Sequence, residues 1–296
     1  MKNPVFTGAA VAIITPMYED GSINFDELGR IIEDQIARGT DAIVICGTTG
    51  ECSTMTDEEQ LAAIKFTVET VNHRVPVIAG AGSNDTDHGC ALAAKSAACG
   101  ADALLLVTPY YNKTNEEGMY LHFKTVADAV KIPCILYNVP GRTGCSISVP
   151  NVARLSQHPN IVGIKEASGN MSYAAKVAKY LSDDFAMYSG NDDMIVPLLS
   201  IGASGVISVL ANIAPKETHQ MVFDYLEGRT DDARRAQIEL LDVINDLFIE
   251  VNPVPVKEAM NLLGMDVGGY RLPLTHMTQA HRETLRSSLA AAGFLK

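Results

Sequence analysis

Eight short apolar runs recur along the first 210 residues, and most of them are followed by turn residues and a helical pattern. Successive runs begin about 20 to 35 residues apart, the length of one strand–helix unit. Eight such units favour a closed parallel barrel over an open sheet, so we predict an α/β fold, a (β/α)8 or TIM barrel. The runs are Ala9–Thr15, Ala42–Cys46, Val75–Ala79, Ala103–Thr108, Cys134–Tyr137, Ile161–Lys165, Phe185–Tyr188 and Gly205–Leu210.

The strand pattern stops after Leu210, and helical periodicity takes over. We predict a barrel over residues 1–225 and an all-helical region over 226–296. No linker-like stretch separates the two, so the helical region is expected to pack on the barrel. The expected helices are Thr218–Leu226, Ala233–Ile249, Val256–Leu263 and Thr275–Ala292, with breaks at Gly228, Asn252-Pro253, Gly268-Gly269 and Pro273.

Charge and cysteine usage exclude several classes of function. A formal net charge of −12 argues against nucleic acid and anionic membranes as partners, and any anion site must be local. No apolar stretch approaches the roughly 18 residues of a membrane span, and the N-terminus makes a poor signal peptide. Six cysteines without a Cys-x-x-Cys pair are expected to be buried free thiols in a reduced, cytoplasmic protein. Seven scattered histidines predict no zinc site.

Lys165 ends the apolar run Ile161–Lys165, where a lysine is unusual. Burial disfavours the charged form of an amine and lowers its pKa. A neutral amine near pH 7 can attack a ketone and form a Schiff base. The alternative is a lysine whose stem is buried while its ammonium reaches water. Lys165 is therefore a candidate nucleophile. The residues near it in the chain decide whether it is a nucleophile or a solvated lysine.

Two glycine-containing segments follow other predicted strands, at the end of the barrel where function sits. Gly47–Glu51 combines two glycines with two threonine hydroxyls, which suits either a carboxylate cradle or a simple turn. Gly190–Asp193 looks at first like a metal loop. It lacks further acids at the right spacing, so we assign it to helix capping.

Tyrosines and an arginine follow the fourth and fifth runs. Tyr110 and Tyr111 either pack or relay protons, and Tyr137 is either a core residue or a reactive one. Arg142 lies in a glycine-flanked turn, where an arginine is more often solvated than bound to a ligand.

Four segments in register resemble the dihydrodipicolinate synthase family, which belongs to the pyruvate-dependent class I aldolases together with N-acetylneuraminate lyase. The resemblance runs over essentially the whole chain. It implies a barrel with a C-terminal helical region. It also implies synthesis of 4-hydroxy-tetrahydrodipicolinate on the lysine pathway from pyruvate and aspartate semialdehyde, without metal or cofactor. The segments are Gly47-Thr48-Thr49-Gly50-Glu51, Thr108-Pro109-Tyr110-Tyr111, Tyr137-Asn138-Val139-Pro140-Gly141-Arg142-Thr143-Gly144 and Gly163-Ile164-Lys165-Glu166-Ala167.

The same resemblance implies a proton relay and a covalent intermediate. Lys165 would attack the pyruvate ketone, and Thr49 with backbone N–H groups of its loop would hold the pyruvate carboxylate. Tyr137 would move protons through Thr48 to Tyr111, which in this family reaches over from a neighbouring subunit. The resemblance therefore implies a homo-oligomer, a dimer or a tetramer.

Three further residues are implied to bind substrate. Arg142 would bind the carboxylate of aspartate semialdehyde, while Gly190 and Ile207 would line the pyruvate pocket. Sibling aldolases that cleave sialic acid or 2-keto-3-deoxy sugar acids are the main alternative. Arg142 argues against them, because a polyhydroxylated aldehyde calls for hydroxyl-bonding groups. A keto-acid sensor without turnover is the remaining alternative, and the complete reactive set disfavours it.

Lysine is expected to inhibit weakly or not at all. Lysine-sensitive family members have an interface pocket, to which Asn84 and Tyr110 correspond. His88 stands where sensitive members commonly have a glutamate, and Asp57 and Gln60 stand where they often have histidines. Asp57 could compensate only if its carboxylate reaches the pocket.

Overall fold

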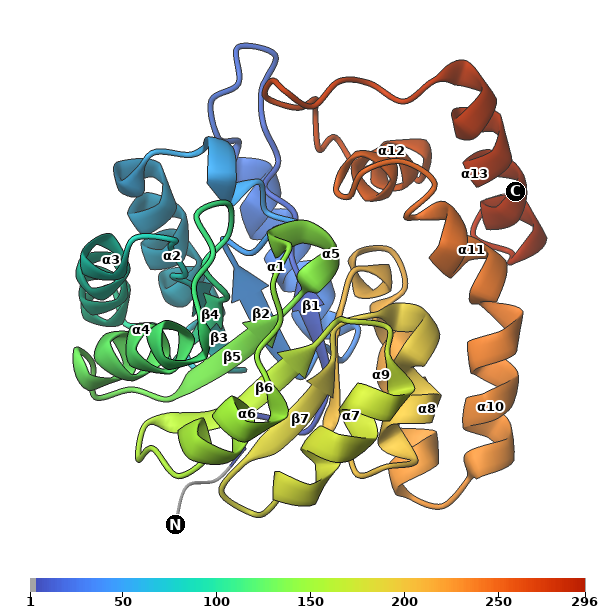
Figure 1. Cartoon of the computed structure of the whole chain (residues 1–296). Coiled ribbons are helices and arrows are strands. Elements are labelled where there is room, and N and C mark those ends of the chain that lie inside the picture. Colours follow the sequence, from blue (N-terminus) through green and yellow to red (C-terminus); the bar gives the residue numbers. More distant parts are fainter. Residues whose placement is uncertain (1–3, 296) are drawn as a thin grey trace.

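Eight parallel strands close into a single barrel in the computed structural model, which describes residues 4–295 (Figure 1). Each strand pairs with its neighbours in sequence, and β1 closes the ring by pairing with β8. The predicted TIM barrel is confirmed. The strands are β1 Gly8–Ala12, β2 Ala42–Ile45, β3 Val77–Gly80, β4 Ala103–Val107, β5 Cys134–Asn138, β6 Ile161–Glu166, β7 Ala186–Ser189 and β8 Gly205–Ser208.

Two strands are shorter by two residues than the apolar runs that predicted them. β1 ends at Ala12 and β8 at Ser208, although the apolar residues after them are also buried. After β1, the amide of Ile14 donates to Oδ1 of Asn212 instead of continuing the ladder. After β8, Leu210 begins the short 3-10 helix η4, Leu210–Asn212. These residues are buried but not paired in the sheet, so the apolar runs extend beyond the ends of the strands.

The outer ring consists of helices with clear start signals. α1 begins after Asn24, whose side chain accepts from the amide of Glu27, and α2 begins with a capping box formed by Thr56 and Glu59. The ring helices are α1 Phe25–Ala37, α2 Asp57–Val71, α3 Thr86–Ala98, α4 Glu116–Asp128, α5 Pro140–Thr143, α6 Val149–Leu155, α7 Met171–Val177, α8 Ile195–Leu199 and α9 Pro215–Leu226. Short 3-10 helices are η1 Cys52–Thr54, η2 Ala178–Tyr180 and η3 Asp192–Met194.

Four helices follow the barrel and lie against it (Figure 1). They are α10 Thr230–Glu239, α11 Leu241–Asp246, α12 Val254–Leu262 and α13 Gln279–Ala291. α10 packs on α9, and α12 contacts η4 next to the barrel mouth. The single helix predicted over Ala233–Ile249 is wrong, because α10 ends before Leu240, a turn residue with ψ of −3°, and α11 ends at Asp246. Leu240 is buried, and neither proline nor glycine marks the break.

Side chains alternate along the strands between two apolar layers. In β1, Ala9 and Val11 face the layer under the helices, whereas Ala10 and Ala12 face the barrel interior. Tyr137 and Ile207 also belong to the interior layer. The pattern therefore directs these two side chains toward the barrel axis.

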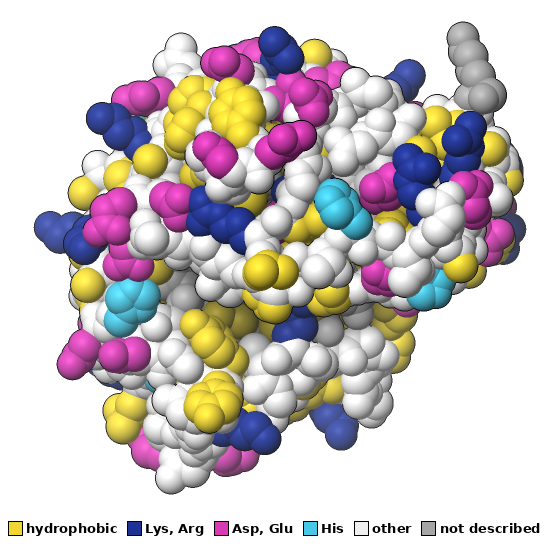
Figure 2. Space-filling view, turned by 90° about the horizontal axis from the view of Figure 1, so that it is seen from above, with side chains coloured by type: hydrophobic (Ala, Val, Ile, Leu, Met, Phe, Trp, Pro, Cys, Tyr) yellow, Lys and Arg dark blue, Asp and Glu magenta, His cyan; other side chains and the backbone are white. Residues whose placement is uncertain are grey.

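The surface seen from above carries acidic and basic side chains side by side around a hollow (Figure 2). No helix among residues 4–295 is long and apolar enough to cross a membrane. All six cysteines are free, as predicted. Only Cys46 and Cys134 are fully buried, however, and the other four are half-buried at helix or loop positions.

Candidate active site

Lys165 lies near the carboxyl end of β6 and is 5% exposed. Burial lowers its pKa to about 8; the carboxylate of Asp192 opposes this shift, and the charge of Arg142 adds to it. The ammonium nitrogen lies 4.5 Å from the centre of the Tyr137 ring. It makes no hydrogen bond or ion pair within the described part of the chain. Lys165 is thus a buried amine without a fixed anionic partner, which suits a nucleophile.

A second buried lysine provides the contrast. Lys257 in α12 is fully buried, but its ammonium donates to Glu51 at 2.8 Å and to the carbonyl of Thr15 at 3.1 Å. Burial lowers its pKa, and the carboxylate of Glu51 counteracts the shift. A lysine held in this way stays an ion-pair partner. Lys257 therefore ties the helical region to the loop after β2 instead of competing as a nucleophile.

The loop Gly47–Glu51 is a tight turn at the end of β2. The amide of Gly50 donates to the carbonyl of Gly47 at 3.1 Å, and the hydroxyl of Thr15 donates to the carbonyl of Gly50 at 2.7 Å. The backbone N–H groups of Thr48 and Thr49 donate to none of the described residues. Two adjacent free N–H groups with two hydroxyls form a cradle suited to a carboxylate.

Tyr137 lies opposite Lys165 in the register of β5 and β6 and is 7% exposed. Burial raises the pKa of its phenol, while nearby Arg142 and a hydrogen bond with Thr48 lower it in part. The phenol is therefore protonated at neutral pH and can donate a proton. The structure brings Lys165, Tyr137 and Thr48 together.

Arg142 lies in α5, directly after β5, with its side chain exposed. One of its terminal nitrogens donates to the backbone carbonyl of Asn252 at 3.3 Å, the one hydrogen bond of this guanidinium within residues 4–295. Its charge acts on both Lys165 and Tyr137, so it lies at the mouth of the same site. Most of its donors remain available to a ligand.

Gly190, directly after β7, borders the stem of Lys165, and Ile207 lies in β8. A Cβ atom on Gly190 would lie 2.6 Å from Cβ of Ala167 and 3.1 Å from Cε of Lys165, so any larger residue would displace the lysine stem. Ile207 is fully buried in the interior layer. Gly190 thus limits the space around Lys165, whereas Ile207 is placed in the interior layer of the barrel.

Tyr111 is not brought into the site of its own chain. Its side chain is 91% exposed, and its backbone has a φ of 68°, which is unfavourable for a tyrosine. Its hydroxyl makes no hydrogen bond within the described part of the chain. Tyr111 of this chain therefore does not complete the predicted relay from Tyr137 through Thr48.

The residues of the predicted regulatory pocket separate into two groups. His88 contacts both oxygens of Asp57, at 3.0 and 3.1 Å, and Asn84 donates to the carbonyl of Tyr110 at 3.1 Å. Gln60 in α2 instead donates to the backbone carbonyls of Cys52 and Met55, in the segment before the helix, at 3.1 and 3.3 Å. Asp57 is thus engaged by His88, and Gln60 faces elsewhere.

Two polar residues, one acting on Lys165 and one contacting Thr49 and Arg142, were not predicted as site residues. Asp192 is buried, and its Oδ2 accepts from the amides of Val209 and Leu210 at 2.9 Å, so it caps η4 and not the helix that follows it. The predicted capping by Gly190–Asp193 is wrong in this respect: η3 has no side-chain cap. Asn252, which the sequence marks only as a helix break, is also buried here. Its amide donates to the hydroxyl of Thr49 at 3.0 Å.

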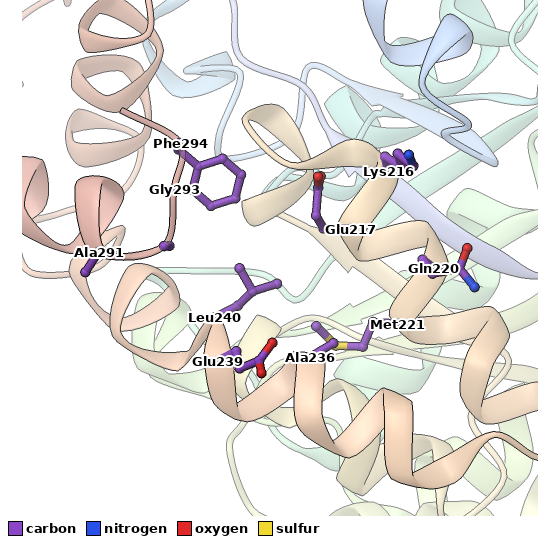
Figure 3. Close-up of a pocket in the computed structure, with 11 residues that line it drawn as sticks. Lys216, Glu217, Gln220, Met221, Ala236, Glu239, Leu240, Ala291, Gly293 and Phe294 are labelled. Carbon is purple, nitrogen blue, oxygen red and sulfur yellow. The ribbon is translucent and has the colours of Figure 1, made fainter. Parts of the chain in front are cut away.

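A cavity of about 640 Å³ lies elsewhere, between α9, α10 and the end of α13 (Figure 3). Lys216, Gln220, Leu240 and Phe294 are among its lining residues. It contains none of the predicted site residues and lies on the outer wall of the barrel. In residues 4–295, no three His, Cys, Asp or Glu side chains gather in a way that could hold a metal ion.

Known proteins resemble this chain over its whole length. The model of the Dihydrodipicolinate synthetase family matches residues 5–292. A curated 4-hydroxy-tetrahydrodipicolinate synthase from Acetivibrio thermocellus is 55% identical over 295 residues, covering 100% of both chains. A solved dihydrodipicolinate synthase from Acinetobacter baumannii, complexed with pyruvate, has a TM-score of 0.95 at 43% identity and covers 98% of this chain and 99% of that one. DHDPS from Cyanidioschyzon merolae with lysine bound has a TM-score of 0.96 at 38% identity, covering 98% and 99%.

Proposed function

The chain belongs to the dihydrodipicolinate synthetase family and is a lyase with the activity of its curated relatives, 4-hydroxy-tetrahydrodipicolinate synthase in lysine biosynthesis; we propose that it works through a Schiff base between Lys165 and pyruvate. The co-substrate is L-aspartate 4-semialdehyde. The observation that carries the proposal is the unpaired, buried amine of Lys165 beside the phenol of Tyr137.

The lowered pKa of Lys165 supports attack on the ketone. With a pKa of about 8, about a tenth of the amine is neutral at pH 7, compared with about three parts in ten thousand at an ordinary pKa of 10.5. The neutral nitrogen attacks C2 of pyruvate, and the carbonyl oxygen leaves as water. The resulting iminium draws electrons from the methyl group, which loses a proton to give an enamine. The enamine carbon then attacks the aldehyde.

The cradle after β2 supports the orientation of pyruvate. The free N–H groups of Thr48 and Thr49 and the hydroxyl of Thr49 would hold the carboxylate. The phenol of Tyr137, hydrogen-bonded to Thr48, would deliver the proton that helps the oxygen leave as water. Gly190 and Ile207 would border the methyl side of the substrate. These steps need no metal and no cofactor other than the covalent intermediate.

One assay separates the synthase from its siblings. Pyruvate with aspartate semialdehyde, coupled to a downstream reductase, is compared with pyruvate and N-acetylmannosamine. Turnover of the first pair alone supports the proposal, and turnover of the second pair alone assigns the site to a sialic acid lyase. Binding of pyruvate without turnover of either pair would make the chain a sensor.

Arg142 is expected to select the aldehyde. Arg142→Ala should lower kcat/KM for aspartate semialdehyde. The expected loss of transition-state stabilisation is about 1.5–3 kcal/mol, the value of a hydrogen bond to a charged group. Reductive trapping of pyruvate should remain nearly unchanged, because the carboxylate cradle is intact. Arg154→Ala, which removes a surface pair with Glu117, is the matched control and should leave both measurements unchanged. Equal losses for both substrates would contradict this role.

The working form is expected to be a homo-oligomer. Tyr111 is exposed and its hydroxyl makes no hydrogen bond within residues 4–295, so a neighbouring subunit would supply the end of the relay. Light scattering of the active protein should give at least twice the chain mass of 31.7 kDa. Tyr111→Phe should lower kcat without dissociating the oligomer. An active monomer at assay concentration would refute the shared relay.

Lysine is expected to inhibit only at high concentration. The carboxylate of Asp57 is already paired with His88, and a protonated imidazole repels the ammonium of lysine. Loss of a charge-assisted contact costs about 1.5–3 kcal/mol, roughly one to two powers of ten in affinity. Initial rates with and without lysine measure this, and His88→Glu should strengthen inhibition. Half-inhibition of the unaltered protein well below about 1 mM would contradict the assignment.

The free cysteines support a reducing compartment. All six lack disulfide partners, and burial raises the pKa of the thiols of Cys46, Cys52 and Cys134. Unreactive free thiols are typical of proteins kept in the cytoplasm. We propose that location for this chain.

A further inference from the structure

Asn252 connects the helical region to both carboxylate-binding side chains of the proposed site. It lies between α11 and α12 and is 5% exposed. Its side-chain amide donates to Oγ1 of Thr49 at 3.0 Å. Its backbone carbonyl accepts from Arg142 at 3.3 Å. One residue thus contacts the group assigned to the pyruvate carboxylate and the group assigned to the aldehyde's carboxylate.

The contact with Thr49 determines where the threonine proton points. A hydroxyl has one hydrogen to donate and two lone pairs that accept. The amide of Asn252 occupies one lone pair, so the hydrogen of Thr49 must point away from Asn252. No described residue accepts it, since the bond from Asn252 is the one hydrogen bond of this hydroxyl within residues 4–295. The proton remains available for an anion in the cradle.

The Oδ1 atom of Asn252 is buried and has no hydrogen-bond partner among the described residues. Buried polar atoms are usually paired, and leaving one unpaired lowers stability. An aliphatic residue would avoid this cost at a position with a structural role alone. The N–H group of the amide is the part of this side chain that finds a partner, the hydroxyl of Thr49.

We propose that Asn252 is a positioning residue that turns the hydroxyl of Thr49 into a donor for the pyruvate carboxylate, while its backbone carbonyl anchors Arg142. This inference rests on the proposed function. It assigns to the helical region a part in substrate binding. The side chain of Asn252 acts on pyruvate binding through Thr49, and its backbone carbonyl acts on aldehyde binding through Arg142.

Asn252→Asp tests the contact of the side chain with Thr49, with almost no change in side-chain shape. The carboxylate would accept the proton of Thr49 and turn it away from the cradle, and its charge would repel pyruvate. In Asn252→Asp the KM for pyruvate is expected to rise about a hundredfold. In Asn252→Ala it is expected to rise about tenfold, because the hydroxyl of Thr49 loses its fixed orientation but no negative charge is added. The KM for aspartate semialdehyde should change less than threefold in both variants, because the backbone carbonyl remains.

A double-variant cycle separates positioning from a structural role. If Asn252 acts through Thr49, adding Asn252→Ala to Thr49→Val should raise the KM for pyruvate no further. Asn261→Asp is the matched control, since Asn261 also makes side-chain hydrogen bonds in the helical region, to the backbone of Gly268 and Val267, but contacts no site residue. It should leave both KM values unchanged. Thermal unfolding of each variant identifies any that fail to fold.

The outcomes distinguish this inference from the proposed function. If the unaltered protein turns over pyruvate and aspartate semialdehyde but Asn252→Asp keeps the original KM for pyruvate, the positioning role is wrong. Additive effects with Thr49→Val would overturn it as well. If the unaltered protein does not use pyruvate at all, the proposed function itself fails.

Discussion

Lys165→Met is expected to lower the rate of condensation by at least about 10³-fold, because an oriented nucleophile contributes effective concentrations of about 10⁵ M or more. Borohydride with pyruvate should label the peptide that carries Lys165 in the unaltered protein, and label none in the variant. The hydride adds to the iminium carbon and leaves a stable secondary amine. Mass spectrometry of the digested protein measures the adduct.

The same experiment yields a pH profile with a defined sign. The pKa of Lys165 is lowered to about 8, so half of the amine is neutral near pH 8 and almost all of it about one to two pH units higher. The trapping rate should therefore rise with pH, reach half of its maximum near pH 8 and level off above about pH 9. A rate that keeps rising to pH 10 would indicate an ordinary lysine pKa.

Two controls separate chemistry from folding. Lys165→Met removes a buried group that carries a desolvation cost, so the variant should be at least as stable as the original protein. Lys257 is equally buried but ion-paired, and it should acquire no label. An adduct on Lys257, or on any lysine other than Lys165, would refute the assignment.

Lys257→Met is expected to destabilise the fold by about 3–5 kcal/mol, because it leaves the carboxylate of Glu51 buried without its cation. The Glu51–Lys257 pair is the most buried ion pair of the described chain, with side-chain exposures of 1% and 0%. Glu51 also accepts from the amide of Arg271 at 3.4 Å. The loss should appear as a lower denaturant midpoint with an unchanged slope.

The double variant and a surface variant test the cause. Glu51→Gln with Lys257→Met removes both charges and should recover a large part of the stability, since the cost arises from the unpaired charge. Arg154→Met breaks an ion pair of similar length, 2.7 Å, at the surface and should cost less than about 1 kcal/mol. If Lys257→Met costs no more than Arg154→Met, the buried pair contributes little to stability.

The sequence alone determined the barrel and pointed to Lys165 as the candidate nucleophile, since both inferences depend on local patterns. Each strand–helix unit is visible in a window of about 30 residues, because burial on both faces of a parallel strand requires a continuous apolar run. Lys165 was recognisable because a charged residue interrupts such a run. The motif around Tyr137 and Arg142 was recognisable because it directly follows a strand in a short turn.

Only the tertiary structure decided how the helical region takes part in the site. Asn252 meets Thr49 across 203 residues of sequence, and Lys257 meets Glu51 across 206. No local pattern encodes such contacts, because they depend on how α12 packs against the barrel mouth. The same holds for the break at Leu240 and for the cap that Asp192 gives to η4. It also holds for Gln60, whose side chain donates to the backbone carbonyl of Cys52. Local periodicity specifies which faces are buried, whereas long-range packing specifies which buried polar groups meet, because each of them must find a partner in the folded chain.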